Sequence, residues 1–360
     1  MTPATPALRA VDLDDKYQLD SGRVFLTGAQ ALVRLLMLQR QRDALAGLNT
    51  AGYVSGYRGS PLGGVDQSLW KAAKFLEREH IRFQPGLNED LAATSIWGSQ
   101  QVNMFPGAKY DGVFAMWYGK GPGVDRCGDV FKHANFAGTS KHGGVLVLAG
   151  DDHAAKSSTL PHQSDHQFSA AMMPVLYPSS VQEILDLGLH GWAMSRYSGC
   201  WVGFKCVSDT VESSASVSVD PNLPRIIVPT DFPLPPDGLS IRWPDAFLAT
   251  EARMQDYKIY AALHYARINQ LNRIVIDSPR PRLGDEPLLG AVGRLQVRGR
   301  HGRELGVGVD RPRPRQYHRP RRLSDAAGRP VDPLAGRVPR HRSADAGLQD
   351  LRGAALLPRE

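Results

Sequence analysis

A carboxylate suited to chemistry stands at the start of a predicted helix, in the segment FQPGLNEDLAATSIWGSQ. Glu89 directly follows Asn88, a good helix N-cap residue, and the strand before them begins near Ile81. Free backbone N–H groups and the positive end of the helix dipole favour an ionised carboxylate there and hold it in one place. Such a carboxylate could hydrogen-bond a ring nitrogen of a cofactor. An ordinary first-turn Glu beside a helix cap would show the same pattern.

Three further segments with polar or glycine-rich sequences each follow a predicted strand. RGSPLGG offers an anion clamp in Arg58, a hydroxyl in Ser60 and glycines that let backbone approach a ligand closely. It lacks both GxxxxGK[ST] and a well-placed GxGxxG, so a phosphate loop is not indicated. YGKGPGVDRCGDV is a second glycine-rich loop. GDDHAAKSSTLPHQSDH gathers many polar side chains, namely Asp151, Asp152, His153, Lys156, Ser157, Ser158, His162 and His166.

The segment GDDHAAKSSTLPHQSDH allows several kinds of site. His162 and His166 have the HxxxH spacing of helical metal ligands, but Pro161 and the absence of HExxH argue against a metal. A Ser–Lys or Ser–His nucleophile would lack its GxSxG elbow. A polar loop that faces a substrate is the better interpretation, with a solvated surface loop as the alternative.

Predicted strands and helices alternate along residues 21–250. Helices are expected at Thr27–Arg42, 65–80, from Glu89 onward, 129–138 and Val181–Arg196, and apolar strands at 49–57, 81–85, 110–119, 143–150 and 200–206. Strands that are apolar on both faces and alternate with helices predict an α/β fold with a parallel sheet between helical layers. Ligands of such folds bind beyond the carboxyl ends of the strands.

Cysteine usage and hydropathy narrow the class of protein further. Three cysteines without CxxC spacing exclude a disulfide framework and an iron–sulfur or zinc site built from this chain alone. Cys200 and Cys206 fall on one face of the strand CWVGFKC and are expected to be core thiols. Residues 1–20 lack the apolar core of a signal peptide, and no run approaches the roughly 18 apolar residues of a membrane helix. We therefore expect a cytoplasmic protein with no membrane partner.

The composition changes abruptly after Gly284. Residues 285–360 contain no Lys, Ile, Phe, Trp, Met, Cys, Asn or Thr, and their 16 Arg against 9 Asp and Glu account for the whole formal net charge of +7. An Arg-rich arm for nucleic acid should also contain Lys and several aromatic residues, whereas Tyr317 is the single aromatic residue here. A reading-frame change in a GC-rich gene explains the simultaneous loss of eight residue types better. We expect this tail to build no core and to be disordered.

Several motifs in consecutive order resemble one known family. These are YRGSPLGG, NEDLAATSIWGSQQVN, MWYGKGPGVDRCGDVFKHAN, GDDHAAKSSTLPHQSDH and SRYSGCWVGFKCVSDTVESSA. Together they resemble the N-terminal part of the indolepyruvate ferredoxin oxidoreductases, in particular their long fused bacterial form, within the 2-oxoacid:ferredoxin oxidoreductases. The resemblance runs from about Leu13 to about Gly284 and ends where the composition changes.

The resemblance implies the pyrimidine-binding domain of a thiamine diphosphate enzyme. It gives Glu89 the catalytic role of hydrogen-bonding the aminopyrimidine ring nitrogen, so that the thiazolium C2 proton can be removed. It assigns cofactor contacts to the turn of Tyr57, Gly59, Ser60 and Pro61, together with Glu89. It also implies substrate carboxylate contacts from Arg58, Ser60, His153 and Lys156.

The family's remaining machinery has no counterpart in this sequence. The diphosphate and Mg²⁺ are held through a GDG motif in another domain, and no GDG occurs here. No iron–sulfur ligand pattern for 4Fe-4S clusters is present either. The resemblance therefore implies a fragment, inactive alone, of an enzyme that uses 2-oxoacid, coenzyme A and ferredoxin and forms homo-oligomers. The alternatives are a sister enzyme for pyruvate or branched 2-oxoacids, a non-catalytic basic protein that binds nucleic acid, and an inert truncated product.

Four segments follow from these observations. We expect an N-terminal extension at 1–20, the thiamine diphosphate pyrimidine domain at 21–250, the start of a second domain at 251–284 and the tail at 285–360.

Limited trypsin digestion tests the predicted tail. Because Arg is dense after Gly284 and no core should protect the backbone, cleavage there should precede cleavage within residues 21–284. Mass spectrometry of early time points should show a stable product that ends close to Gly284. A tail that survives as long as the rest of the chain would show that it is folded.

Overall fold

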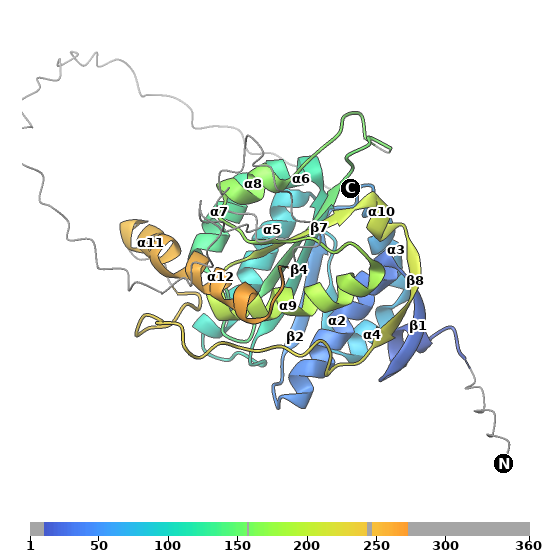
Figure 1. The fold of residues 1–360 in the computed structure, drawn as a ribbon, viewed down its shortest axis with the longest axis horizontal. Coiled ribbons are helices and arrows are strands. Elements are labelled where there is room, and N and C mark those ends of the chain that lie inside the picture. Colours follow the sequence, from blue (N-terminus) through green and yellow to red (C-terminus); the bar gives the residue numbers. More distant parts are fainter. Residues whose placement is uncertain (1–10, 157, 243–246, 273–360) are drawn as a thin grey trace, which may run out of the picture. The chain divides into compact units, whose positions relative to one another are not determined.

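A parallel sheet forms the centre of the structure (Figure 1). The structure is a computed structural model that describes residues 11–156, 158–242 and 247–272. The six strands of the sheet lie in the order β3-β2-β4-β5-β7-β6, and every neighbouring pair is parallel. The strands are β2 (Ala51–Gly56), β3 (Ile81–Phe83), β4 (Val113–Lys120), β5 (Val145–Asp151), β6 (Val175–Leu176) and β7 (Val202–Val207). The predicted α/β class with a parallel sheet is thereby confirmed.

Helices cover both faces of this sheet, as its apolar strands require. One face carries α2 (Gly28–Leu45), α3 (Gly63–Lys71), α4 (Ala73–Arg78), α9 (Val181–Ser198) and α12 (Ile259–Ile268). The other face carries α5 (Glu89–Gln100), α6 (Gly121–Arg126), α7 (Gly128–Ala137) and α8 (Asp165–Ala170). Alternate residues of β4 enter the two cores, so that Tyr118 belongs to the first and Trp117 to the second. The predicted helical layers on both sides of the sheet are confirmed.

The remaining elements lie outside these two layers. They are α1 (Asp15–Gln18), a 3₁₀ turn (Val102–Met104), α10 (Ser208–Val211), α11 (Phe247–Arg253) and a π-helical turn (Met254–Lys258). α12 packs on α9, and its Ala262, Tyr265 and Ala266 belong to the core of the first face. The described residues all fall in one compact unit. The predicted tail at 285–360 lies outside the described residues, as does 273–284 of the predicted second domain.

A separate two-stranded ribbon was absent from the sequence-based prediction. β1 (Gly22–Thr27) pairs antiparallel with β8 (Ser214–Val219), with Gly22 opposite Val219. Val24, Leu26, Val217 and Val219 are buried, while the residues between them are more exposed. Each strand carries only two buried apolar residues, too few to stand out from a polar loop before the partner strand is known.

Two local predictions were wrong in detail. The predicted single helix at 65–80 is two helices, α3 and α4, which meet at Ala72. The predicted glycine-rich loop at 118–130 contains α6, which begins directly after β4. Pro122 in the first turn of α6 explains this helix, because its fixed φ suits a helix start and its missing N–H has no helical partner to lose.

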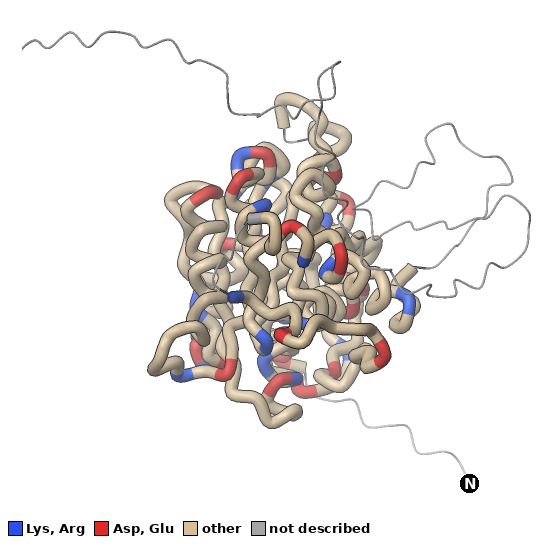
Figure 2. The backbone as a smooth tube through the Cα atoms, turned by 90° about the vertical axis from the view of Figure 1, so that its left-hand side faces the viewer, with Lys and Arg blue, Asp and Glu red and all other residues tan. Residues whose placement is uncertain are grey.

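Basic and acidic residues are interspersed over the described part of the chain (Figure 2). Residues 1–284 hold 27 Lys and Arg and 27 Asp and Glu, so the net positive charge belongs to the tail. Among the described helices, none combines the length and the apolar character needed to cross a membrane. Cys127, Cys200 and Cys206 are free and buried, and burial raises the pKa of the Cys200 and Cys206 thiols, which confirms both as core residues.

A buried ion pair ties the two long helices of the first face together. Arg196 of α9 binds Asp43 of α2 through two nitrogens, Nη1 to Oδ1 at 2.7 Å and Nη2 to Oδ2 at 2.8 Å. Arg196 Nε also donates to the Gly143 carbonyl at 2.7 Å, just before β5. Asp43 accepts further hydrogen bonds from Thr50 Oγ1 at 2.7 Å and Gln39 Nε2 at 2.8 Å. The Arg196–Asp43 pair therefore links both helices to the starts of β2 and β5.

Removing one partner of this pair should destabilise the fold strongly. In Arg196→Met the Asp43 carboxylate stays buried without its cation, which should lower the free energy of unfolding by about 3–5 kcal/mol. Lys74→Met is the matched control, because the Lys74–Asp14 pair is exposed and should contribute about 1 kcal/mol or less. Urea unfolding of the three proteins measures both effects. Equal losses would show that the buried pair contributes no more than a surface pair.

Candidate active site

The connections that leave β2 and β4 turn to opposite faces of the sheet. The connection after β2 leads to α3 in the core of the first face, and the connection after β4 leads to α6 in the second. Ligands of open α/β sheets bind outside the carboxyl ends of the strands at such a point. The predicted site residues Tyr57–Pro61 and Glu89 belong to segments that follow β2 and β3.

Glu89 is the first residue of α5, as predicted, and its side chain is half-buried. Asn88 is the N-cap, and its side-chain oxygen accepts a hydrogen bond from the Leu91 backbone N–H at 2.9 Å. The Glu89 carbonyl oxygen accepts a second hydrogen bond from Trp117 Nε1 at 3.1 Å. Trp117 is fully buried and packs edge-on against Phe131, with ring centroids 4.9 Å apart. The backbone that carries the carboxylate is therefore fixed to the core.

The Glu89 side chain rests on the first turn of α6. A Cβ atom placed on Gly123 would lie 2.6 Å from Glu89 Cγ and 2.9 Å from Oε1, closer than van der Waals contact allows. Only glycine leaves room for the side chain in this position. Burial, and then the Asp90 and Glu89 carboxylates, raise the pKa of the nearby Cys127 thiol. The Cys127 thiol is therefore neutral.

The predicted turn Tyr57–Pro61 lies against the end of β4. A Cβ atom placed on Gly59 would lie 3.0 Å from Lys120 Cβ, at the last residue of β4. The Ser60–Pro61 peptide bond is cis. Ser60 and Pro61 line a shallow cavity of about 360 Å³. Its other lining residues are Gly63, Gly64, Thr27 at the end of β1, Ala29 of α2, Val211 and Glu212. Glu89 does not line that cavity. The segment that leads to Glu89 meets the end of β2 directly, because the Gly86 backbone N–H donates to the Gly56 carbonyl at 2.9 Å.

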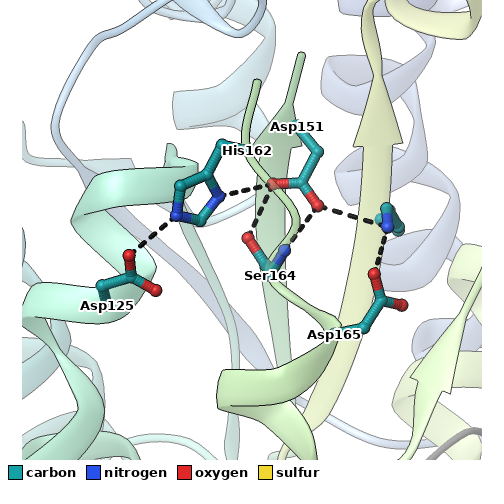
Figure 3. Close-up of polar contacts among 6 residues, drawn as sticks. Asp125, Asp151, His162, Ser164 and Asp165 are labelled. Carbon is teal, nitrogen blue, oxygen red and sulfur yellow. Dashed lines mark hydrogen bonds and ion pairs between the residues drawn. The ribbon is translucent and has the colours of Figure 1, made fainter. Parts of the chain in front are cut away.

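A polar network not predicted as a unit lies at the carboxyl end of β5 (Figure 3). Asp151 is fully buried and accepts hydrogen bonds from the Ser164 hydroxyl at 2.7 Å and the Ser164 backbone N–H at 2.9 Å. Lys205 Nζ lies 3.4 Å from Asp151 Oδ2 and also pairs with Asp165. The His162 ring lies between two carboxylates, with Nδ1 3.3 Å from Asp151 Oδ1 and Nε2 2.7 Å from Asp125 Oδ2.

These carboxylates decide the charge of His162. Partial burial disfavours the protonated ring, but the hydrogen bonds to Asp125 and Asp151 outweigh it and raise the pKa of His162 above 6.5. The sequence singled out Asp151 and His162 as members of a polar loop. It did not indicate Asp125 or Lys205, because these two come from other segments that only the fold brings together.

His153 and Lys156, the two predicted substrate residues of this loop, are exposed. Lys156 Nζ pairs with Asp209 Oδ1 of α10 at 2.7 Å, which draws its side chain toward the end of β7. Arg58 is also exposed, and 44% of the Tyr57 surface is accessible. Within the described ranges no group of three or more His, Cys, Asp or Glu side chains is arranged to hold a metal ion. A substrate role for Arg58, Ser60, His153 and Lys156 stays a prediction.

Comparison with known proteins gives relatives of one kind. No family model matches the chain. The chain is 29% identical over 187 residues to the indolepyruvate oxidoreductase subunit IorA of Methanothermobacter marburgensis, which covers 52% of this chain and 26% of that protein. The subunit of Methanothermobacter thermautotrophicus is 24% identical over 281 residues, or 76% of this chain and 40% of that protein. The Pyrococcus abyssi subunit is 28% identical over 177 residues, or 49% and 24%.

These relatives are of the kind that the motifs predicted, and they support a member of the 2-oxoacid:ferredoxin oxidoreductase family. The matched regions span between about a quarter and two fifths of the relatives' own length. A solved 2-oxoglutarate:ferredoxin oxidoreductase from Magnetococcus marinus matches with a TM-score of 0.39 and 16% identity over 56% of this chain and 31% of that one. A TM-score this low does not define a shared fold.

Gly123→Ala tests the packing of the Glu89 side chain against Gly123. The added methyl group would overlap the Glu89 side chain and displace its carboxylate, so any catalysis that depends on this carboxylate should fall by about 100-fold. Gly98→Ala in α5 is the matched control, because a Cβ atom there meets nothing within 4 Å. That change should keep activity and stabilise the protein by up to about 1 kcal/mol. Equal activity of the two variants would contradict the contact between Gly123 and Glu89.

Proposed function

We propose that this chain supplies the pyrimidine side of a thiamine diphosphate site in an enzyme that oxidatively decarboxylates aryl 2-oxoacids, with indolepyruvate as the favoured substrate. The products would be the acyl-CoA and carbon dioxide, and ferredoxin would accept the electrons. The position of Glu89 carries the proposal. It is the first residue of a capped helix at the carboxyl edge of a parallel sheet, in a segment that resembles the activating glutamate motif of this family.

The residues around Glu89 fit the pyrimidine end of the cofactor. Thiamine diphosphate, when bound, supplies the electron sink for decarboxylation of a 2-oxoacid. Glu89 Oε would share a proton with a ring nitrogen of the cofactor, and the Trp117 hydrogen bond keeps the Glu89 backbone in place. Gly123 admits the Glu89 side chain beside α6. The carboxylate is thereby oriented before any ligand arrives, and so less ordering remains for the reaction itself.

The turn after β2 would contribute the substrate side. Ser60 lines the cavity beside α2, and its hydroxyl would hydrogen-bond a carboxylate oxygen. Arg58, two residues earlier, would bind the same carboxylate through two nitrogens. His153 and Lys156, from the loop after β5, are weaker candidates for this anion because Lys156 already pairs with Asp209. Tyr57, Gly59 and Pro61 would shape the turn that holds Ser60.

The sequence motifs of this chain do not account for the other parts of the proposed enzyme. No GDG sequence is present, so the diphosphate and Mg²⁺ would be held by another domain or chain, as would the 4Fe-4S clusters. Without that end of the cofactor we expect no activity from these 360 residues alone. Coenzyme A, ferredoxin and a homo-oligomeric assembly are proposed from the family resemblance. A cytoplasmic location suits the three free thiols.

We propose indolepyruvate as the substrate, and not pyruvate or a branched 2-oxoacid, because the curated relatives are named indolepyruvate oxidoreductase subunits. Comparison of kcat/KM for indolepyruvate and pyruvate in the complete enzyme separates the two. A preference for pyruvate would reassign the substrate while keeping the role of Glu89.

Glu89→Gln tests the proposal in the complete enzyme that contains this chain. The amide keeps the size of the side chain but cannot exchange a proton with the ring nitrogen as the carboxyl group can. Exchange of the thiazolium C2 proton for deuterium, measured with cofactor bound and substrate absent, should slow by about 10² to 10⁴. Cofactor affinity should change much less, because the diphosphate and its metal contribute most of it.

Asp90→Asn is the matched control for that experiment. Asp90 is the next residue of α5, and its carboxylate pairs with Arg126 at 2.5 Å. The same loss of one carboxylate there should leave the exchange rate within about twofold, because an exposed pair contributes little. An unchanged rate in Glu89→Gln would reduce Glu89 to an ordinary first-turn residue and sink the proposed function.

A further inference from the structure

His162 has a carboxylate oxygen at each ring nitrogen, Asp125 Oδ2 at 2.7 Å from Nε2 and Asp151 Oδ1 at 3.3 Å from Nδ1. A neutral imidazole has one N–H donor and one acceptor, so it can satisfy only one of two ionised carboxylates. The protonated ring donates to both. The geometry therefore selects the imidazolium, and the raised pKa of His162 agrees with this.

The same ring packs against the first residue of α6. A Cβ atom placed on Gly121 would lie 2.0 Å from His162 Nδ1, so the imidazole lies directly on the backbone of this helix. Two residues further along, Gly123 makes the close contact with the Glu89 side chain. The first turn of α6 is thus packed between His162 and Glu89. A shift of His162 would be transmitted to Glu89 through Gly121 and Gly123.

We propose that His162 is a positioning residue for Glu89: its two carboxylate contacts hold the first turn of α6 against the Glu89 side chain. The inference rests on the proposed function of Glu89 and adds a residue to which the family motifs give no role. When His162 loses its proton, one of the two carboxylate contacts is lost. His162 then holds the first turn of α6 less firmly, and the Glu89 side chain that packs against this turn is no longer fixed in position.

Charged groups from the neighbouring elements affect whether His162 is protonated. Asp125 comes from α6 and is exposed, while Asp151 ends β5 and is fully buried. Lys205 of β7 lies 3.4 Å from Asp151 and disfavours a second positive charge, and it also pairs with Asp165 of α8. Asp152 follows Asp151, and its carbonyl accepts from the His162 backbone N–H at 3.4 Å. The hydrogen bonds of Asp125 and Asp151 to the ring favour the proton on His162.

The first experiment measures the proton on His162 directly in the 360-residue chain. NMR titration of ¹⁵N-labelled histidine side chains, with His162 assigned from the signal that His162→Gln removes, should show it titrating above pH 6.5. Asp125→Asn should move that titration to lower pH, because the ring loses its 2.7 Å carboxylate partner. His166→Gln is the control, an exposed histidine of the next helix, and should leave the His162 titration in place.

The second experiment measures C2 proton exchange in the complete enzyme as a function of pH. At neutral pH the wild-type rate should exceed the His162→Gln rate by about 10-fold to 100-fold. The ratio of the two rates should fall toward one as pH rises through the pKa measured for His162, because wild type then loses the same contact. Asp125→Asn should move this fall to lower pH, and it remains informative if His162→Gln does not fold.

Two results would overturn the inference. One is a His162 titration that is the same in wild type and Asp125→Asn, and the other is a rate ratio that does not change with pH. Either result, combined with slow exchange in Glu89→Gln, rejects the role of His162 and keeps the proposed function. Fast exchange in Glu89→Gln rejects the proposed function itself, whatever the titration of His162 shows.

Discussion

The close approach of Glu89 and His162 to the first turn of α6 is the constraint on which the site depends. Both contacts require a residue without a side chain, and Gly121 and Gly123 supply it. Any larger residue at these positions would push α5 or the loop after β5 away from the first turn of α6. These two positions require glycine because a side chain would not fit, and not because of the backbone conformation, since neither glycine has a left-handed backbone.

The fold could be predicted from local patterns because its strands are apolar on both faces. Segments such as GGVLVLAG carry this pattern without interruption, and β5 forms where it predicts. The order of strands could not be predicted, because every strand shows the same apolar pattern. The β1–β8 ribbon was missed for a related reason, since its few buried residues acquire meaning only when the two strands are paired.

In the candidate site, too, features formed by neighbours in sequence could be predicted, whereas contacts between distant residues could not. Glu89 and its Asn88 cap are neighbours in sequence, so the helix start was predictable. The seat of Glu89 on Gly123 and the pairing of His162 with Asp125 join residues that are 34 and 37 positions apart. Spacing within one segment cannot indicate such contacts. The HxxxH spacing of His162 and His166 likewise gives no indication of the two carboxylate partners of His162.

The β1–β8 ribbon has a consequence for synthesis of the chain on the ribosome. Arg23 of β1 hydrogen-bonds Ser216 of β8, 193 positions later. β1 emerges early, yet its partner strand is made only after the whole parallel sheet. During that interval β1 presents an unpaired edge on which another nascent chain could dock. The final pairing closes a very long loop, a slow step for which the preformed sheet and α2 must first bring the two ends together.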